Sequence, residues 1–315
     1  MTSEEALTLI ESASDPLTLF GSDPARQFRK LARLTHPDTH PGDRRAAEAF
    51  ARLAALWQRR THTTTNGKLV ARGDLANLYE HEQGLLKLVR DHADSDLIDR
   101  EANALRTLKT RADKRYLPYV PVLIESQLRK DPATGTTRRA NVIGRLDGFV
   151  TLAEVKAAYP DGLDPRDAAW MWRRLLVAIG LASQAGLIHA AVLPEHVMIH
   201  PADHGLVLVD WCYALEAPQG RPVAVPARYK SWYPAEILDR QPAGPDLDIY
   251  LATKTMTDLI GNAISPQLAA FAQGCLLKNP ARRPQDAWHL LGELDEVFGR
   301  LYGPRKFRPF TMKGR

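Results

Sequence analysis

Four basic residues and a tripeptide form the clearest chemical pattern in this 315-residue chain. The basic residues recur at the i, i+3, i+4 and i+7 spacing of one helix face, and His36-Pro37-Asp38 follows them closely. They form the basic stripe, which consists of Arg26, Arg29, Lys30 and Arg33. Side chains of one charge on one face favour a partner of the opposite charge.

The whole chain carries a small basic excess, with a formal net charge of +5 and a pI near 9.2. This excess favours acidic partners or nucleotides, but it is too small to indicate nucleic-acid binding, and an arginine-rich solvated surface accounts for it. The two cysteines, Cys212 and Cys275, lie far apart and form neither a metal motif nor a disulfide framework, which fits a reducing compartment.

The first residues are acidic and lack a basic segment followed by an apolar run, so we expect no signal peptide. No apolar stretch approaches the roughly 18 residues that would suggest a membrane span. We therefore expect a soluble, cytoplasmic protein without a membrane partner.

Two amphipathic helices joined by a proline-rich loop must position the tripeptide. Residues 24–34 are predicted as the first helix, because Asp23 is a good N-cap and Pro24 suits the first helical position. Residues 43–60 are predicted as the second, with an apolar face formed by Phe50, Leu53, Ala54 and Trp57. The polar run 61–67 has no periodicity and ends in glycine, so we expect a linker there.

Beyond the linker, strands come before helices. Short β-rich runs fill residues 68–150, with one helix at 98–110 and a hairpin loop expected at 130–139. The later part is mainly helical, with short strands near 197–200 and 206–210 and helices at 165–186, 246–262, 266–277 and 284–301. A small strand-rich unit followed by a larger helical one makes a two-lobed cleft, where small molecules commonly bind.

The tail, residues 303–315, is basic and aperiodic, and we expect it to be extended or disordered. A solvated tail is favoured over the alternative, a docking segment formed by Arg305, Lys306, Phe307 and Phe310. On the helix at 165–186, Trp170 and Trp172 cannot share one face, so we expect one in the core and the other partly exposed.

Residues 15–60 resemble the J-domain of DnaJ-type co-chaperones. The resemblance is carried by FRKLARLTHPDTHPGD and then EAFARLAALWQ, with LTLFG at 17–21 in the place of the first helix. It implies that His36, Pro37 and Asp38 engage a DnaK-type chaperone and stimulate its ATP hydrolysis. The basic stripe would steer the chain toward an acidic patch on that partner.

This resemblance has two departures. The connector between the first two helices is short, and Thr35 stands where an aromatic residue is usual. They leave open which chaperone is engaged and how tightly. The alternative is a helical hairpin in which the tripeptide only makes a turn.

Residues 68–300 resemble the protein-kinase fold, whose landmarks occur in the correct order. Lys87 in GLLKLVR matches the strand lysine that holds nucleotide phosphates, and Glu101 in REANALRTL matches its helix partner. A buried lysine needs such a counter-charge to remain cationic. Gly73 stands in the place of the glycine-rich phosphate loop, where only one glycine remains, and Asp210 in LVLVDWCYA matches the metal-binding aspartate.

The catalytic loop of this resemblance has lost its reactive groups. In GLIHAAVLPEHVMIHP, His189 matches the loop histidine, but the aspartate corresponds to Ala191, the lysine to Leu193 and the asparagine to His196. Alanine cannot accept a proton, and leucine brings no charge to a migrating phosphoryl group; losing a base costs about 10²–10⁴-fold in rate. Ordinary phosphorylation of Ser, Thr or Tyr is therefore not expected.

Three further matches are structural. Glu236 in WYPAEIL and Arg283 in CLLKNPARRPQDAW are expected to form an ion pair, and Asp248 in DLDIYLATK lies on the central helix of the lower lobe. A retained scaffold beside lost chemistry is typical of a pseudokinase.

The resemblance leaves ligand binding open. Lys87, Glu101 and Asp210 would still hold a phosphate and one divalent ion, which implies ATP with Mg²⁺ or Mn²⁺ as the cofactor. The alternative is that no cofactor binds and that Lys87 and Glu101 form a structural ion pair. His196 beside Asp210 suits a softer metal such as Mn²⁺ or Zn²⁺, but a hydrogen bond from His196 to nearby backbone is the favoured interpretation.

The sequence thus predicts an α+β architecture: an all-helical J-domain at 1–60, a linker at 61–67, a bilobal kinase-like domain at 68–302 with a β-rich N-lobe and a helical C-lobe, and a basic tail at 303–315. The expected function is that of a co-chaperone-like adaptor that recruits a DnaK-type chaperone while the kinase-like domain binds a client or partner protein. Two alternatives stay open. One is an atypical ATP-dependent transferase that uses Lys87, Glu101 and Asp210; the other is a decoy that sequesters the chaperone.

Overall fold

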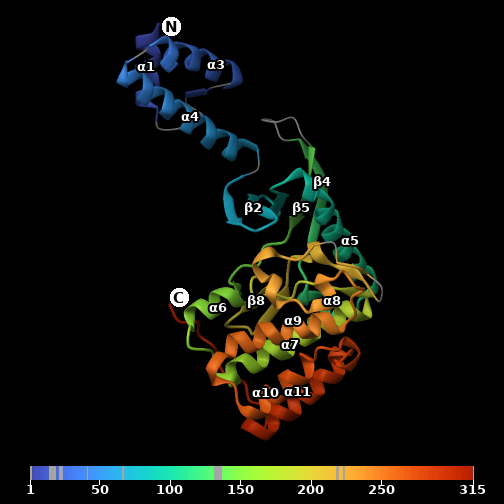
Figure 1. Ribbon diagram of the computed structural model, residues 1–315. Helices are drawn as coiled ribbons and strands as arrows, with labels where there is room; N and C mark the ends of the chain where they lie inside the picture. The colour runs from blue at the N-terminus through green and yellow to red at the C-terminus, as the bar shows by residue number, and fades with distance from the viewer. Residues whose placement is uncertain are drawn as a thin grey trace.

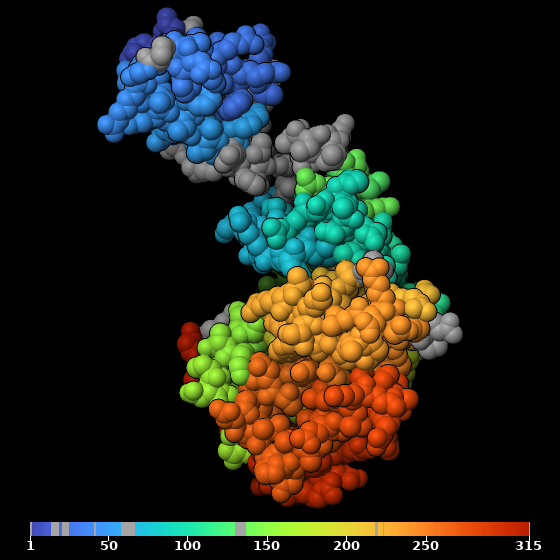
Figure 2. Space-filling view, viewed as in Figure 1, coloured from blue at the N-terminus to red at the C-terminus, as the bar shows by residue number. Residues whose placement is uncertain are grey.

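The computed structural model describes residues 2–13, 19–20, 24–40, 42–65, 67–130, 137–217, 220–222 and 224–314. Helices and sheets are both present, which confirms the mixed α+β class. In the described part, the buried side chains fall into separate clusters, one drawn from residues 6–56 and the others from residues 75–310. Figure 1 shows the first of these regions as a helical body at the N-terminal end of the molecule, and Figure 2 shows the same region as a blue lobe at one end.

The N-terminal region is helical throughout its described length. Its elements are α1 (Ser3–Ser12), α3 (Pro24–Thr35), the short 3-10 turn η1 (Pro37–Thr39) and α4 (Arg44–Thr65). Leu31 and Leu53 are completely buried between α3 and α4, as the apolar spacing of both helices requires. The predicted hairpin is therefore present, with the tripeptide in its loop.

Two features of this region differ from expectation. The helix α1 was not predicted; of the helix expected at 17–21, Leu19 and Phe20 are helical and the other residues lie outside the described ones. In addition, α4 continues to Thr65, so that helix fills most of the expected linker at 61–67. Propensity is a weak guide here, because a helix that has already begun adds each further residue at little cost.

A five-stranded antiparallel sheet follows, with the order β1-β2-β3-β5-β4. The strands are β1 (Leu69–Arg72), β2 (Ala76–His81), β3 (Gly84–Val89), β4 (Leu123–Lys130) and β5 (Thr137–Ile143). The helix α5 (Ser95–Arg111) packs against this sheet (Figure 1) and also contacts the short turn η4 (Trp211–Tyr213). All five strands and this helix were predicted; the loop expected at 130–139 falls mainly on residues outside the described ones.

The larger second part is mainly helical. Its helices are α6 (Leu152–Ala158), α7 (Pro165–Gln184), α8 (Ala235–Leu238), α9 (Asp246–Ile260), α10 (Pro266–Cys275) and α11 (Ala287–Tyr302). Its short strands are β6 (Val150–Thr151), β7 (Leu187–Ile188), β8 (Val197–His200), β9 (Gly205–Leu208) and β10 (Leu215–Glu216). The central helix α7 packs against both α9 and α11, as Figure 1 shows.

The expectation of one partly exposed tryptophan on α7 was wrong. Trp170 and Trp172 are 6% and 0% exposed, because neighbouring elements cover α7 on more than one face. The expectation of an extended, solvated tail fits residues 303–309, which are exposed and belong to no helix or strand, but it was wrong for Phe310. Phe310 is 6% exposed, and the C-terminus lies beside α6 (Figure 1). The single buried aromatic side chain outweighs the basic composition that had suggested solvent.

Candidate functional site

A buried group of charges lies where the sheet meets the helical part. The Lys87 Nζ atom on β3 is 2.9 Å from Glu101 Oε1 on α5 and 2.7 Å from Asp210 Oδ1, which follows β9. The Lys87 and Glu101 side chains are 7% and 1% exposed, and Asp210 is 19% exposed. The structure thus brings together these three predicted residues, and the nucleotide role that the sequence gave them stays a prediction.

Neighbouring elements fix both ends of this group. Lys87 lies opposite Asn141 in the β3–β5 ladder, and the Asn141 side-chain amide donates to Glu101 Oε2 at 2.9 Å and to the Ile98 carbonyl at 3.0 Å. These bonds tie α5 to the sheet. Asp210 has the left-handed backbone conformation, with φ at 67°, which aspartate tolerates better than most residues. Sequence reasoning missed Asn141, because an isolated asparagine in a strand carries no signal.

The buried charges of Lys87 and Asp210 shift each other's pKa toward the ionised form. Burial alone lowers the pKa of Lys87, but the carboxylates of Asp210 and Glu101 outweigh it and hold that pKa well above its ordinary value. Burial alone raises the pKa of Asp210, and the Lys87 ammonium outweighs it and lowers that pKa far below its ordinary range. Lys87 and Asp210 are therefore both ionised at neutral pH.

The thiol of Cys212 completes the surroundings of the ammonium group. It accepts from Lys87 Nζ at 3.2 Å, and burial raises its pKa well above the ordinary value, so it is a neutral thiol. Glu101, Asp210 and Cys212 place one ligand-type atom each within 4.8 Å of one another. The Lys87 ammonium group contacts all three of these residues, so a positive charge is already present beside their ligand-type atoms.

Hydrogen bonds to a side chain of α9 fix the backbone of the loop from His189 to Leu193. The Asp248 carboxylate accepts from the backbone N–H groups of His189 at 2.7 Å and Ala190 at 2.8 Å. Ala191 and Leu193 are 0% and 1% exposed. Neither side chain can accept a proton, and both lie in apolar packing, so the loop is ordered without a base.

His189 is a neutral part of this packing. Its Nε2 atom lies 2.9 Å from the Val209 carbonyl and its Nδ1 atom accepts from the Ala191 N–H at 3.2 Å, which fixes the proton on Nε2. Burial lowers the pKa of His189 to about 3. A second proton on Nδ1 would face the Ala191 N–H group.

His196 points between the backbone and Asp210. Its Nδ1 atom lies 2.8 Å from the Ala191 carbonyl, which confirms the favoured interpretation of a backbone hydrogen bond. Because a carbonyl only accepts, the proton lies on Nδ1, and the Nε2 atom is left 3.4 Å from Asp210 Oδ2. These two residues, predicted as metal ligands, are therefore neighbours in the structure.

The turn between β1 and β2 contains Gly73. The Gly73 N–H donates to the Ala76 carbonyl at 2.9 Å, and a Cβ atom at this position would lie 2.7 Å from the same oxygen, so only glycine fits. The next residue, Asp74, accepts from the Tyr213 hydroxyl at 3.1 Å. This bond joins the turn to the segment after Asp210 and places a carboxylate, which repels phosphate, in the turn. Sequence reasoning did not find this contact.

The predicted pair of Glu236 and Arg283 is confirmed. Arg283 is buried, and its Nη1 atom donates to Glu236 Oε1 at 2.5 Å and to Asp246 Oδ2 at 3.0 Å. The second carboxylate was not predicted. This cluster joins α8, the start of α9 and the segment before α11.

The predicted chaperone-binding residues form an exposed surface on the N-terminal hairpin. The side chains of His36 and Asp38 are 44% and 88% exposed, and all four residues of the basic stripe are exposed. The His36 ring lies edge-on to Phe50 of α4, with ring centroids 5.0 Å apart. Thr35, in the place of the usual aromatic residue, is completely buried, and its hydroxyl donates to the Leu31 carbonyl.

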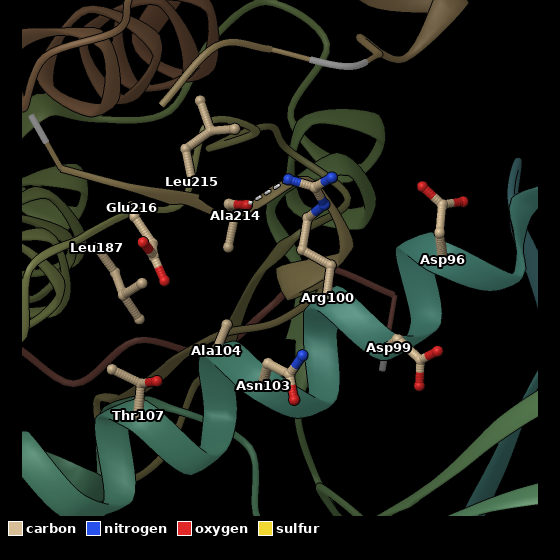
Figure 3. A pocket seen from close by; sticks show the side chains of 10 residues that line it. All are labelled: Asp96, Asp99, Arg100, Asn103, Ala104, Thr107, Leu187, Ala214, Leu215 and Glu216. Carbon is tan, nitrogen blue, oxygen red and sulfur yellow. Dashed lines mark hydrogen bonds between the residues drawn. The ribbon is translucent and has the colours of Figure 1, made fainter. Parts of the chain in front are cut away.

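A pocket of about 360 Å³ lies against α5 (Figure 3). Its walls are α5 and the chain around β7 and β10, and Arg100 Nη1 bridges them by donating to the Ala214 carbonyl at 3.4 Å. The acidic side chains of Asp96, Asp99 and Glu216 also line it. The pocket shares α5 and the chain after Asp210 with the charged group.

Comparison with protein-family models gave no match, and comparison with curated proteins gave no relative. In the part of the chain that the structure describes, no helix combines the length and the apolar character that crossing a membrane requires.

Proposed function

We propose that this chain is a co-chaperone-like adaptor whose N-terminal hairpin is a J-domain that engages a DnaK-type chaperone. The observation that carries the proposal is an exposed surface formed by His36 and Asp38 in the loop and by the basic stripe along α3, while α3 and α4 pack through their other faces. A solvent-facing charged surface of this kind is not needed to hold the hairpin together. It suits capture of an acidic partner surface.

The test is stimulation of a DnaK-type chaperone's ATPase by the purified full chain. We expect stimulation by the wild type, its loss in His36→Gln, and a salt-dependent weakening in Arg29→Glu. Arg44→Gln is the matched control, because Arg44 is exposed on α4 outside the basic stripe. Binding of the chaperone without stimulation would instead make the chain a decoy, and absence of binding would refute the proposal.

The remaining part of the chain is proposed to be a kinase-like unit that binds a client or partner protein and does not transfer phosphate. Support comes from the loop at Ala191 and Leu193, where buried apolar side chains stand in place of a base and a cation. The backbone of this loop is ordered by Asp248 and His189. Its conformation is therefore maintained without a substrate.

Nucleotide and metal binding are proposed as a regulatory property of the same unit. Asp210 and His196 would hold a divalent ion, because atoms 3.4 Å apart can both lie about 2.0–2.2 Å from one metal ion. The backbone bond of His196 Nδ1 orients Nε2 as a ligand, as second-sphere bonds do in metal sites. Lys87 would meet a phosphate, while the carboxylate of Asp74 opposes phosphate in the neighbouring turn.

Calorimetry with ATP and either Mg²⁺ or Mn²⁺ tests this property. We expect metal-dependent binding that is lost in Lys87→Ala and in Asp210→Asn, with circular dichroism as the check that both variants fold. Transfer of radiolabel from ATP to protein, abolished by the same substitutions, would favour the alternative of an atypical transferase. The charged group of Lys87, Glu101 and Asp210 is the feature that supports this alternative.

A further inference from the structure

The C-terminal segment Phe307–Lys313 packs on a surface of the helical part formed by Tyr159, Asp167, Trp170 and His204, which we call the groove. Arg308 Nε donates to Asp167 Oδ1 at 2.6 Å and Arg308 Nη2 donates to Asp167 Oδ2 at 3.2 Å, while Nη2 also lies 3.4 Å from Asp164 Oδ2. Phe310 is buried against the rings of Tyr159 and Trp170, whose centroids lie 6.1 and 6.3 Å away. The Tyr159 hydroxyl donates to the Thr311 carbonyl at 3.1 Å.

The floor of this groove is aromatic. His204 stacks on Trp170 with centroids 4.2 Å apart and planes 5° apart, and Phe307 lies over His204 at 4.7 Å. Trp170 is 6% exposed, and its Nε1 atom is buried without a hydrogen-bond partner among the described residues. The tail therefore leaves one donor in the groove unsatisfied, which costs free energy.

The contacts of this segment are similar to those of a bound peptide. It belongs to no helix or strand, and most of its residues are exposed, Phe307 by 73%. Its attachment rests on the buried Phe310 side chain, the ion pairs of Arg308 and the hydrogen bond from Tyr159 to Thr311. A buried aromatic anchor and an arginine are residues that commonly dominate protein interfaces. A segment that belonged to the core would be buried over more of its length.

We propose that this groove is a peptide-docking site with the chain's own tail as its built-in occupant. Its external ligand is an extended segment of a partner protein with an arginine two residues before an aromatic residue, the spacing of Arg308 and Phe310. A partner segment that also offers an acceptor to Trp170 Nε1 gains a bond that the tail lacks. Binding of the partner displaces the tail. The inference is independent of the function proposed above.

The test uses full-length chains and a fluorescent peptide with the sequence of residues 306–313, followed by anisotropy. In the wild type the tethered tail competes at a high effective concentration, so we expect weak peptide binding. In Phe310→Ala the tail is released, and we expect the peptide to bind at least tenfold more tightly. Arg305→Ala is the control within the tail, because Arg305 is exposed and lies outside the docked segment, and we expect it to behave as the wild type does.

Two further measurements make the result specific. Adding both Asp164→Asn and Asp167→Asn to Phe310→Ala is expected to weaken peptide binding about tenfold, since both carboxylate partners of Arg308 are lost. A peptide carrying Phe310→Ala is expected not to bind. Arg308→Ala serves as a second tail-release variant if Phe310→Ala does not fold. Equal peptide affinity for wild type and folded release variants, or no binding to either, would show that the tail is a fixed part of the fold.

Discussion

The neutral, buried His189 makes the stability of this protein depend on pH in a defined direction. The folded pKa is about 3 and the ordinary value is 6.5, so the unfolded chain takes up a proton over a range in which the folded chain does not. Stability from this residue is therefore complete above about pH 7.5 and is lost as the pH falls toward 3. At pH 5 the loss is about 2 kcal/mol, from 1.5 pH units at about 1.36 kcal/mol each.

The perturbation is His189→Gln, which removes the titration. Urea unfolding followed by tryptophan fluorescence at pH 7.5, 6 and 5 gives the free energy of unfolding for both proteins. We expect the variant to be less stable at pH 7.5, because packing against Trp211 is lost, but to lose about 2 kcal/mol less than the wild type between pH 7.5 and 5.

The difference between wild type and His189→Gln in the pH dependence of the free energy of unfolding isolates the contribution of His189. Burial raises the pKa of Asp248 to about 7, so that the folded chain retains a proton that the unfolded chain releases above about pH 4. Stability from Asp248 therefore falls as the pH rises, in the opposite direction to that from His189. Asp248 is present in both proteins. The exposed His92 provides the control variant His92→Gln, which should keep the wild-type slope. The reasoning is refuted if His189→Gln shows that slope as well.

Three further predictions concern stability and are measured by the same urea unfolding. Lys87→Met should destabilise the protein by about 3–5 kcal/mol, because it leaves Glu101 buried without its cation; adding Glu101→Gln should recover part of this loss, and full additivity of the two changes would contradict the coupling. Arg283→Met should cost a similar amount, about 3–5 kcal/mol, since it strands two carboxylates at once, and a loss under 1 kcal/mol would show that the cluster is solvated. Gly162→Ala should be destabilising by more than about 1 kcal/mol, because the new Cβ atom would lie 2.1 Å from the Ile260 carbonyl at a φ of 111°, whereas Gly299→Ala, with open space in α11, should be neutral or stabilising by up to about 1 kcal/mol.

The elements that position the charged group could be predicted because their signals are local. The strand around Lys87 and the helix around Glu101 each show their type in a short run of residues, and their pairing followed from a resemblance in landmark order. The pair of Glu236 and Arg283 followed in the same way and is present. Asp246, the second partner of Arg283, carried no signal of its own, because acidic residues at a helix start are common.

The parts that sequence reasoning missed depend on contacts between distant segments. Asn141 holds Glu101 from the neighbouring strand, and Tyr213 reaches Asp74 across 139 positions. The docked tail is a similar case, since its composition indicates solvent and only the groove on the folded helices makes burial of Phe310 possible. A hydrogen bond or an anchor of this kind has no periodicity to detect.

The loop at His189 bears most directly on the function proposed above. Its backbone is held by Asp248, its histidine is neutral, and the carbonyl of Ala191 bonds to His196. Every one of these interactions lies within the protein and none requires a reacting group. At position 191 a carboxylate would have to be buried at 0% exposure, where it would be costly without a cation beside it. Alanine at this position avoids that cost. Under the adaptor function proposed above, such a loop would offer a partner a rigid surface and not a reactive one.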